Sequence, residues 1–288
     1  MAEPEAPQSL RVPFDSVPVL VRVSGPPGTP LVLFAHPFPL HGGCWDQLLE
    51  ATAAAAGFRA AAVDAPGFGG SPALGRRLLM DDLAQIFALA MDALHAPRAL
   101  LVGSSMGGYA VQAFARLFPD RLAGALLIGT KASADTHEAR EKRQNQAILA
   151  LSKGAASVVD AALPSQIDAA SPALPRVKEL AAGATAQGVA DALRGMAERP
   201  DSRASLAAWT APALVIGGTS DKIVTAAEID ELAAGIPGAA KRMLPTGHLV
   251  FIEAEAEVEA LLLSFLKACL AGNAWSRRAS ERTKVDFA

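Results

Sequence analysis

Apolar positions along the first 130 residues fall into two alternating patterns. Short β-rich runs lie at residues 58–67, 98–104 and 122–130, and segments with helical periodicity separate them. This alternation is typical of a mostly parallel sheet with helices on both faces. The helical segments are predicted at residues 44–57, 80–96 and 106–121.

Two further apolar runs, at residues 18–25 and 30–37, flank the turn-forming stretch "PPGT". Proline and glycine at such a position favour a tight turn. The pattern therefore predicts two strands joined as a hairpin, which would form an antiparallel edge of the sheet.

Strand signals disappear after residue 130 and return near residue 210. The interval contains helical segments at 136–154 and 173–200, so we predict a helical cap, residues 131–209, inserted into a core formed by residues 12–130 and 210–271. Residues 272–288 mix charges without periodicity, which predicts a mobile tail. The last core elements are a strand at 211–218, a helix at 225–236, a short strand at 240–244 and a closing helix at 251–271.

Composition narrows the function classes. The 288 residues are 51% hydrophobic and 19% charged, with a formal net charge of −3, so a large core is possible and no basic face for nucleic acid is evident. Cys44 and Cys269 lie far apart without metal-ligand spacing, which favours a reducing compartment and argues against disulfides and a metal site.

Targeting signals are not evident either. The N-terminal stretch carries Glu3 and Glu5 where a signal peptide needs positive charge, and the longest apolar run near the C-terminus is interrupted by Lys267. That run is also shorter than the roughly 20 residues that a bilayer requires. We expect a cytoplasmic protein without membrane partners, either a monomer or a homo-oligomer.

The stretch "LLVGSSMGGY" contains a G-x-S-x-G motif formed by Gly103, Ser105 and Gly107. In this motif the serine lies on a tight turn between a strand and a helix, and both elements are predicted here. Ser105 is therefore the candidate nucleophile, and Ser104 occupies the variable position. A glycine-rich turn whose serine only caps the next helix is the alternative.

A serine nucleophile needs a base and an orienting acid, and the later chain supplies both. Asp221 follows the strand at 211–218, and His248 follows the strand at 240–244. Catalytic groups gather at such carboxyl ends of parallel strands. Asp135, five residues beyond the strand that ends at Thr130, is a weaker alternative acid.

The order serine, aspartate, histidine, together with the motifs "HPFPLHGGCW", "DAPGFGGS", "GSSMGGY", "GGTSDKIV" and "GHLVFIE", resembles the α/β-hydrolase fold superfamily. The similarity spans roughly residues 12–271 and is strongest to small bacterial esterases, lactonases and cofactor-free haloperoxidases. It implies an oxyanion hole built from the backbone N–H groups of Phe38 and Met106. Pro37 replaces the glycine usual in that loop, and "EAEAE" replaces the family's Glu-x-Pro after His248.

Other polar residues near these motifs have structural interpretations. We expect His36 to support the oxyanion loop and Asp64 to hold its own loop. His41 and Trp45 are candidates for the pocket mouth, Trp45 equally for the core, and Cys44 for an ordinary buried thiol.

The sequence thus predicts a serine hydrolase that cleaves a small or medium uncharged carboxylic ester, lactone or thioester, without metal or cofactor. Serine at the nucleophile position argues against dehalogenase and epoxide hydrolase chemistry, which uses aspartate there in this superfamily. The cap arginines Arg140, Arg143 and Arg194 are interpreted as surface residues rather than ligands of a substrate carboxylate. A ligand-sensing protein with slow or no turnover, and a carbon–carbon hydrolase or lyase, are the alternatives.

Overall fold

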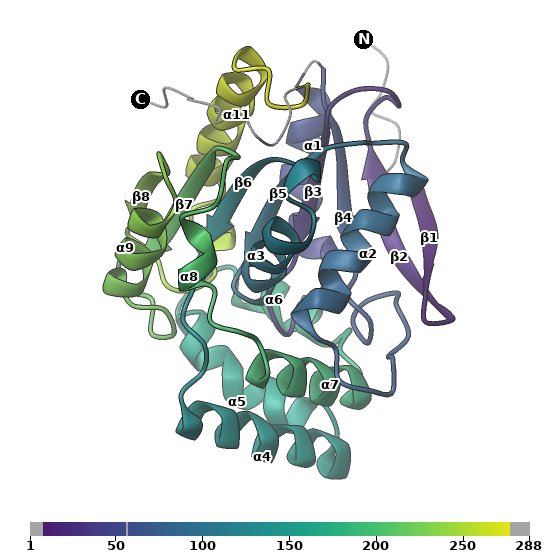
Figure 1. The fold of residues 1–288 in the computed structure, drawn as a ribbon. Helices are drawn as coiled ribbons and strands as arrows, with labels where there is room; N and C mark the ends of the chain where they lie inside the picture. The colour runs from purple at the N-terminus through teal and green to yellow at the C-terminus, as the bar shows by residue number, and fades with distance from the viewer. Residues whose placement is uncertain (1–7, 56, 277–288) are drawn as a thin grey trace.

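A computed structural model describes residues 8–55 and 57–276. It confirms the predicted fold class: one mostly parallel sheet has helices on both faces, and further helices lie beyond the carboxyl ends of its strands (Figure 1). The strands, in chain order, are β1 (Gln8–Phe14), β2 (Val17–Ser24), β3 (Leu31–Ala35), β4 (Arg59–Val63), β5 (Ala99–Ser104), β6 (Leu122–Ile128), β7 (Ala213–Gly218) and β8 (Ala240–Leu244).

The strand order is β1-β2-β4-β3-β5-β6-β7-β8, in which β1 and β2 are antiparallel to each other and β2 is antiparallel to β4. The predicted hairpin between β2 and β3 is therefore wrong. The hairpin joins β1 to β2 through Asp15 and Ser16, which both have positive φ. β3 instead lies between β4 and β5, parallel to both, because its five apolar residues are buried on both faces.

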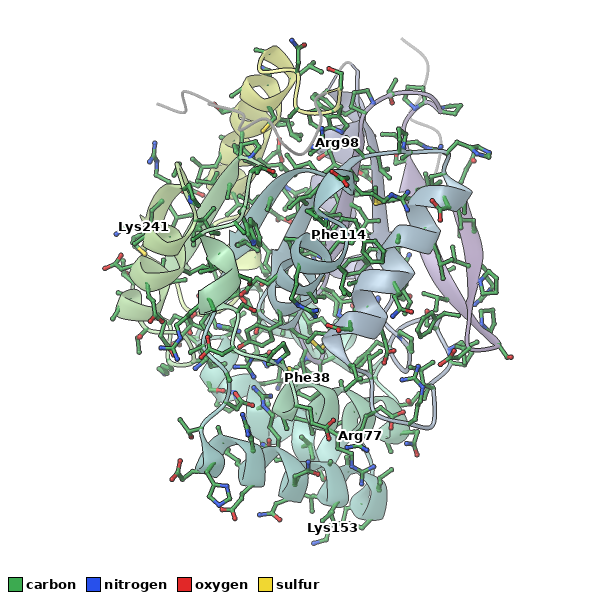
Figure 2. The ribbon with its side chains drawn as sticks, in the orientation of Figure 1. Phe38, Arg77, Arg98, Phe114, Lys153 and Lys241 are labelled. Carbon is green, nitrogen blue, oxygen red and sulfur yellow. The ribbon has the colours of Figure 1, made fainter. Side chains whose placement is uncertain are left out.

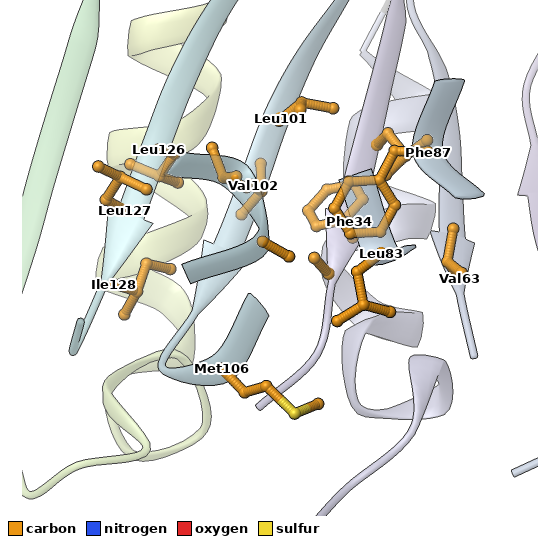
Figure 3. Close-up of a cluster of buried hydrophobic side chains, with 14 of the residues drawn as sticks. Phe34, Val63, Leu83, Phe87, Leu101, Val102, Met106, Leu126, Leu127 and Ile128 are labelled. Atoms are coloured by element: carbon orange, nitrogen blue, oxygen red, sulfur yellow. The ribbon is translucent and has the colours of Figure 1, made fainter. Parts of the chain in front are cut away.

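Helices cover the two faces of the sheet in pairs. α1 (Asp46–Ala54) and α11 (Glu255–Ala271) contact each other on one face, and α2 (Met80–Ala93) and α3 (Met106–Leu117) contact each other on the other. Their buried apolar side chains meet those of the strands in one continuous core. Figure 3 shows the part of it where Leu83 and Phe87 of α2 lie beside Phe34 of β3. The other elements outside the cap are η1 (Gly42–Trp45), η2 (Pro119–Arg121), α9 (Ala226–Gly235) and α10 (Val250–Glu253).

Five helices form the layer between β6 and β7, in the segment predicted as a cap. Main-chain hydrogen bonds fix this layer to the core: the N–H of Thr185 donates to Gly67 O at 2.9 Å, and the N–H of Leu78 donates to Asp191 O at 3.0 Å. The largely buried helix α7 is thus held at its N-terminus and near its middle. The cap helices are α4 (His137–Lys153), α5 (Ala156–Gln166), α6 (Leu174–Ala181), α7 (Ala186–Ala197) and α8 (Arg203–Leu206).

The C-terminal elements differ from prediction in two details. The closing helix is divided into α10 and α11 at Ala254, whose φ of −125° is not helical, in the stretch where the family's Glu-x-Pro is replaced. Residues 272–276 of the expected mobile tail pack on the core: Ala274 is fully buried, and the indole N–H of Trp275 donates to Leu31 O at 3.3 Å. The remainder of that predicted tail, residues 277–288, lies outside the described residues.

In the described part of the chain, none of the helices has both the length and the apolar character needed to cross a membrane. Across the same residues, no three His, Cys, Asp or Glu side chains form a group suited to a metal ion.

Candidate active site

Ser105 lies on a sharp turn between β5 and α3. Its φ of 50° and ψ of −111° are unusual for a residue with a side chain, and its N–H donates to Ile128 O at 2.9 Å. The turn requires a glycine at position 107, because a Cβ there would collide with Ala35 O on β3. The strain is typical of a residue held in place for function.

The two neighbouring serines have different environments. Ser104 is fully buried inside β5, whereas Ser105 is partly exposed at the end of the strand. Within residues 8–55 and 57–276, the Oγ of Ser104 has no hydrogen-bond partner. Only Ser105 therefore presents its hydroxyl group at the edge of the sheet.

Asp221 and His248 form a buried pair. Nδ1 of His248 donates to Oδ2 of Asp221 at 2.8 Å, and both side chains are 1% exposed. The second carboxylate oxygen accepts the N–H groups of Ile223 at 2.7 Å and Val224 at 3.0 Å. The backbone of its own loop thus fixes Oδ1 of the aspartate, and Oδ2 faces the imidazole of His248.

Gly129, at the end of β6, connects this pair to Ser105. It has a φ of +52°, and a Cβ at this position would lie 3.0 Å from His248 O and 3.5 Å from His248 Nδ1. The preceding residue, Ile128, accepts the Ser105 N–H, and Oγ1 of the following residue, Thr130, donates to Ser105 O at 2.9 Å. The serine turn and the Asp221–His248 pair therefore meet around the end of β6.

The loop after β3 positions the Phe38 N–H. His36 accepts the Ala65 N–H on Nε2 at 2.9 Å, so its proton lies on Nδ1, which donates to Pro37 O at 3.0 Å. Pro37 O also accepts the Leu40 N–H at 3.0 Å. Because a trans peptide places its N–H opposite its C=O, these bonds fix the direction of the Phe38 N–H.

The second predicted oxyanion donor, Met106, is the first residue of α3 (Figure 3). N–H groups in the first turn of a helix have no intrahelical partner and carry partial positive charge. Figure 2 shows Phe38 between the sheet and the cap helices. Both predicted donors therefore lie at the edge of the sheet that carries Ser105.

Burial lowers the pKa of His36 to about 4, although its bond to Pro37 and the charge of Asp64 oppose the shift. The free energy of unfolding is therefore expected to fall as the pH drops from 7 to 4, because the unfolded histidine, with its ordinary pKa of 6.5, binds a proton that folded His36 does not. Between pH 7 and pH 4 this difference in pKa lowers the free energy of unfolding by about 3 kcal/mol. Urea unfolding at pH 7, 6, 5 and 4 measures this loss. In His36→Gln the decline should be shallower, and an identical decline would contradict the assignment.

Two of the other polar residues have structural contacts. Asp64, fully buried, accepts the N–H groups of Gly42 and Gly70, both at 2.8 Å, and so joins two loops. His41 accepts the Gly43 N–H at the start of η1. Trp45 belongs to the core, fully buried and stacked on Phe251 with 3.9 Å between ring centroids.

Asp135, the alternative acid, lies in a different network. Its carboxylate pairs with Arg143 at 2.6 Å and with buried Arg199 at 2.7 Å. Burial alone would raise the pKa of Asp135, but the two arginines outweigh it and lower the pKa below its usual value. Arg199 also lies 4.1 Å above the Tyr109 ring on α3. Asp135 therefore connects α4 to Arg199, which in turn contacts α3.

Three further residues support the site and were not singled out from the sequence. Gly129 gives space to the Asp221–His248 pair, Glu253 accepts the Gly247 N–H at 3.2 Å beside His248, and Gln166 donates to Phe38 O at 3.0 Å. Gly129 could have been found from the sequence, because it is a glycine directly after an apolar strand. Gln166 has no distinguishing pattern in the sequence.

Known proteins share this architecture. A thermophilic esterase from Thermogutta terrifontis, solved with malate bound, matches with a TM-score of 0.84 and 29% sequence identity, over 92% of this chain and 99% of that one.

Among curated proteins, an acetyltransferase component of the acetoin cleaving system from Pseudomonas putida is 33% identical over 85% of this chain, and the match spans only 65% of that relative's length. A 2-hydroxy-6-oxononadienedioate/2-hydroxy-6-oxononatrienedioate hydrolase from Burkholderia vietnamiensis is 41% identical over 26% of each chain. The model of the alpha/beta hydrolase family matches residues 32–261, which is most of the chain. The chain therefore belongs to the alpha/beta hydrolase family.

Proposed function

We propose that this chain is a serine hydrolase that cleaves a small or medium uncharged carboxylic ester, lactone or thioester. The observation that carries the proposal is the buried hydrogen bond between His248 and Asp221 beside the strained turn of Ser105. A histidine whose Nδ1–H is held by a carboxylate presents Nε2 as a proton acceptor. That is the role a serine nucleophile needs.

The reaction proceeds in two steps. His248 accepts the Ser105 proton as Oγ attacks the acyl carbon, and Asp221 stabilises the imidazolium that forms. The backbone N–H groups of Phe38 and Met106 hold the oxyanion. His248 then protonates the leaving group, and water activated by the same histidine releases the acyl group from Ser105.

The cap favours uncharged acyl groups. The buried side chains of α5 and α7 are mainly aliphatic. Of the cap arginines, Arg143 is held in an ion pair with Asp135, and Arg140 is exposed on α4. A buried carboxylate needs a paired cation, so these positions argue against a charged substrate.

A carbon–carbon hydrolase is the second candidate, supported by the relative from Burkholderia vietnamiensis. The name of that relative describes a dioate, which would bring two carboxylates to the protein. The mainly aliphatic buried side chains of α5 and α7 make the uncharged ester the better supported substrate.

Treatment with a fluorophosphonate, followed by intact-mass analysis and peptide mapping, tests the activated serine directly. We expect one adduct on Ser105, together with hydrolysis of p-nitrophenyl butyrate. Adduct formation with cleavage of a 2-hydroxy-6-oxo-dienoate, and not of the ester, would favour the second candidate. Folded protein without an adduct would contradict the proposal and favour a ligand-sensing protein.

A further inference from the structure

Gln166, the last residue of cap helix α5, contacts two loops of the candidate active site. Its Nε2 donates to Phe38 O at 3.0 Å, and its main-chain oxygen accepts the Leu249 N–H at 3.3 Å. Leu249 directly follows His248. One residue of the cap therefore links the oxyanion loop, which follows β3 and carries Phe38, to the loop after β8 that carries His248.

The bond to Phe38 completes the support of that residue. Phe38 lies between two peptide groups, and the preceding one is held from the core through Pro37 O. The following peptide group is held from the cap, through the bond from Gln166 to Phe38 O. Hydrogen bonds therefore hold both peptide planes that flank Phe38, one from the core and one from the cap, and together they restrict rotation of the plane that carries its N–H.

The orientation of the Gln166 amide also follows from this contact. The side chain is 5% exposed, and among the described residues no donor reaches its Oε1. Turning the amide over would set Oε1 against Phe38 O, two acceptors without a hydrogen between them. The side chain is therefore held by its donor end, and that end serves one oxygen of the oxyanion loop.

We propose that Gln166 is a positioning residue for the oxyanion hole, so that docking of the cap completes the site. The inference rests on the proposed function. It makes the cap part of the machinery that stabilises the transition state, in addition to covering the substrate. Loss of the amide should weaken binding of the oxyanion while leaving binding of the ground-state ester almost unchanged, because a carbonyl oxygen becomes charged only in the transition state.

Gln166→Met keeps the side-chain length and removes the donor. With p-nitrophenyl butyrate we expect kcat to fall about tenfold and KM to stay within about twofold, as for loss of an interaction made in the transition state. The inhibition constant of 1,1,1-trifluoro-2-pentanone, which has the same acyl chain and forms a tetrahedral oxyanion on the serine, should weaken by the same factor. Gln166→Asn, whose shorter side chain does not reach Phe38 O, should behave in the same way.

Gln187→Met is the matched control. Gln187 is also a cap glutamine, and its Nε2 donates to Asp191 at 2.7 Å. This variant should keep the wild-type kcat and ketone affinity. Thermal melting of each variant identifies any loss of folding, and Gln166→Asn replaces Gln166→Met if the latter does not fold.

Wild-type kcat and ketone affinity in both folded Gln166 variants, with an active parent, would overturn the inference alone. So would a rise in KM without a change in kcat. A parent that neither hydrolyses the ester nor reacts with the fluorophosphonate would instead overturn the proposed function, and the inference with it.

Discussion

Replacing Ser105 by alanine is expected to lower kcat/KM for p-nitrophenyl butyrate by about 10⁴-fold or more and to abolish the fluorophosphonate adduct, because no other hydroxyl group occupies the strained turn between β5 and α3. Alanine removes only the Oγ atom, so the fold should be unchanged. The measurement is steady-state kinetics together with intact-mass analysis, and a melting curve confirms that the variant is folded.

Ser104→Ala is the matched control for this substitution. Ser104 precedes Ser105 in the same motif, but its side chain is fully buried in β5. Its hydroxyl group is also without a partner in the part of the chain that the structure describes, so alanine should preserve both activity and stability. Loss of activity in Ser104→Ala with activity retained in Ser105→Ala would show that the register of the motif is wrong.

Seven of the eight strands in the described sheet could be predicted from the sequence because they follow apolar runs, whereas β1 was not predicted. The strand order at the antiparallel edge was predicted wrongly. The turn-forming stretch "PPGT" fits a tight hairpin, but it also fits a connection between two strands that are not neighbours, which is how β2 and β3 are joined. The uninterrupted apolar run of β3 was the better guide, since a strand buried on both faces belongs in the centre of a parallel sheet.

The pairing of Asp221 with His248 was predictable for a similar reason. Each residue follows a parallel strand, β7 and β8 are neighbours, and the carboxyl ends of such strands meet at one edge. The contact of Gln166 with Phe38 was not predictable. It joins residues 128 positions apart and depends on how the cap packs on the core, which local periodicity does not encode.

Asp221→Asn is expected to lower kcat/KM by about 10³- to 10⁴-fold. Oδ1 of Asp221 accepts two backbone N–H groups, so in asparagine this position must remain the oxygen, and the NH₂ group must take the place of Oδ2. It would then donate to His248 Nδ1 and force the imidazole proton onto Nε2. In that tautomer His248 no longer accepts the Ser105 proton, although the geometry and the fold are kept.

Asp135→Asn distinguishes this mechanism from a general effect of removing a buried carboxylate. Asp135 contacts Arg143 and Arg199 and no catalytic candidate, so its loss leaves two arginines without their partner. We expect the free energy of unfolding to fall by about 3 kcal/mol or more, with kcat of the folded protein retained. Urea unfolding and initial rates on both variants separate the two effects. If Asp135→Asn instead abolished turnover while Asp221→Asn left it intact, the acid would belong to the loop after β6, and the hydrogen bond at His248 would have a structural role.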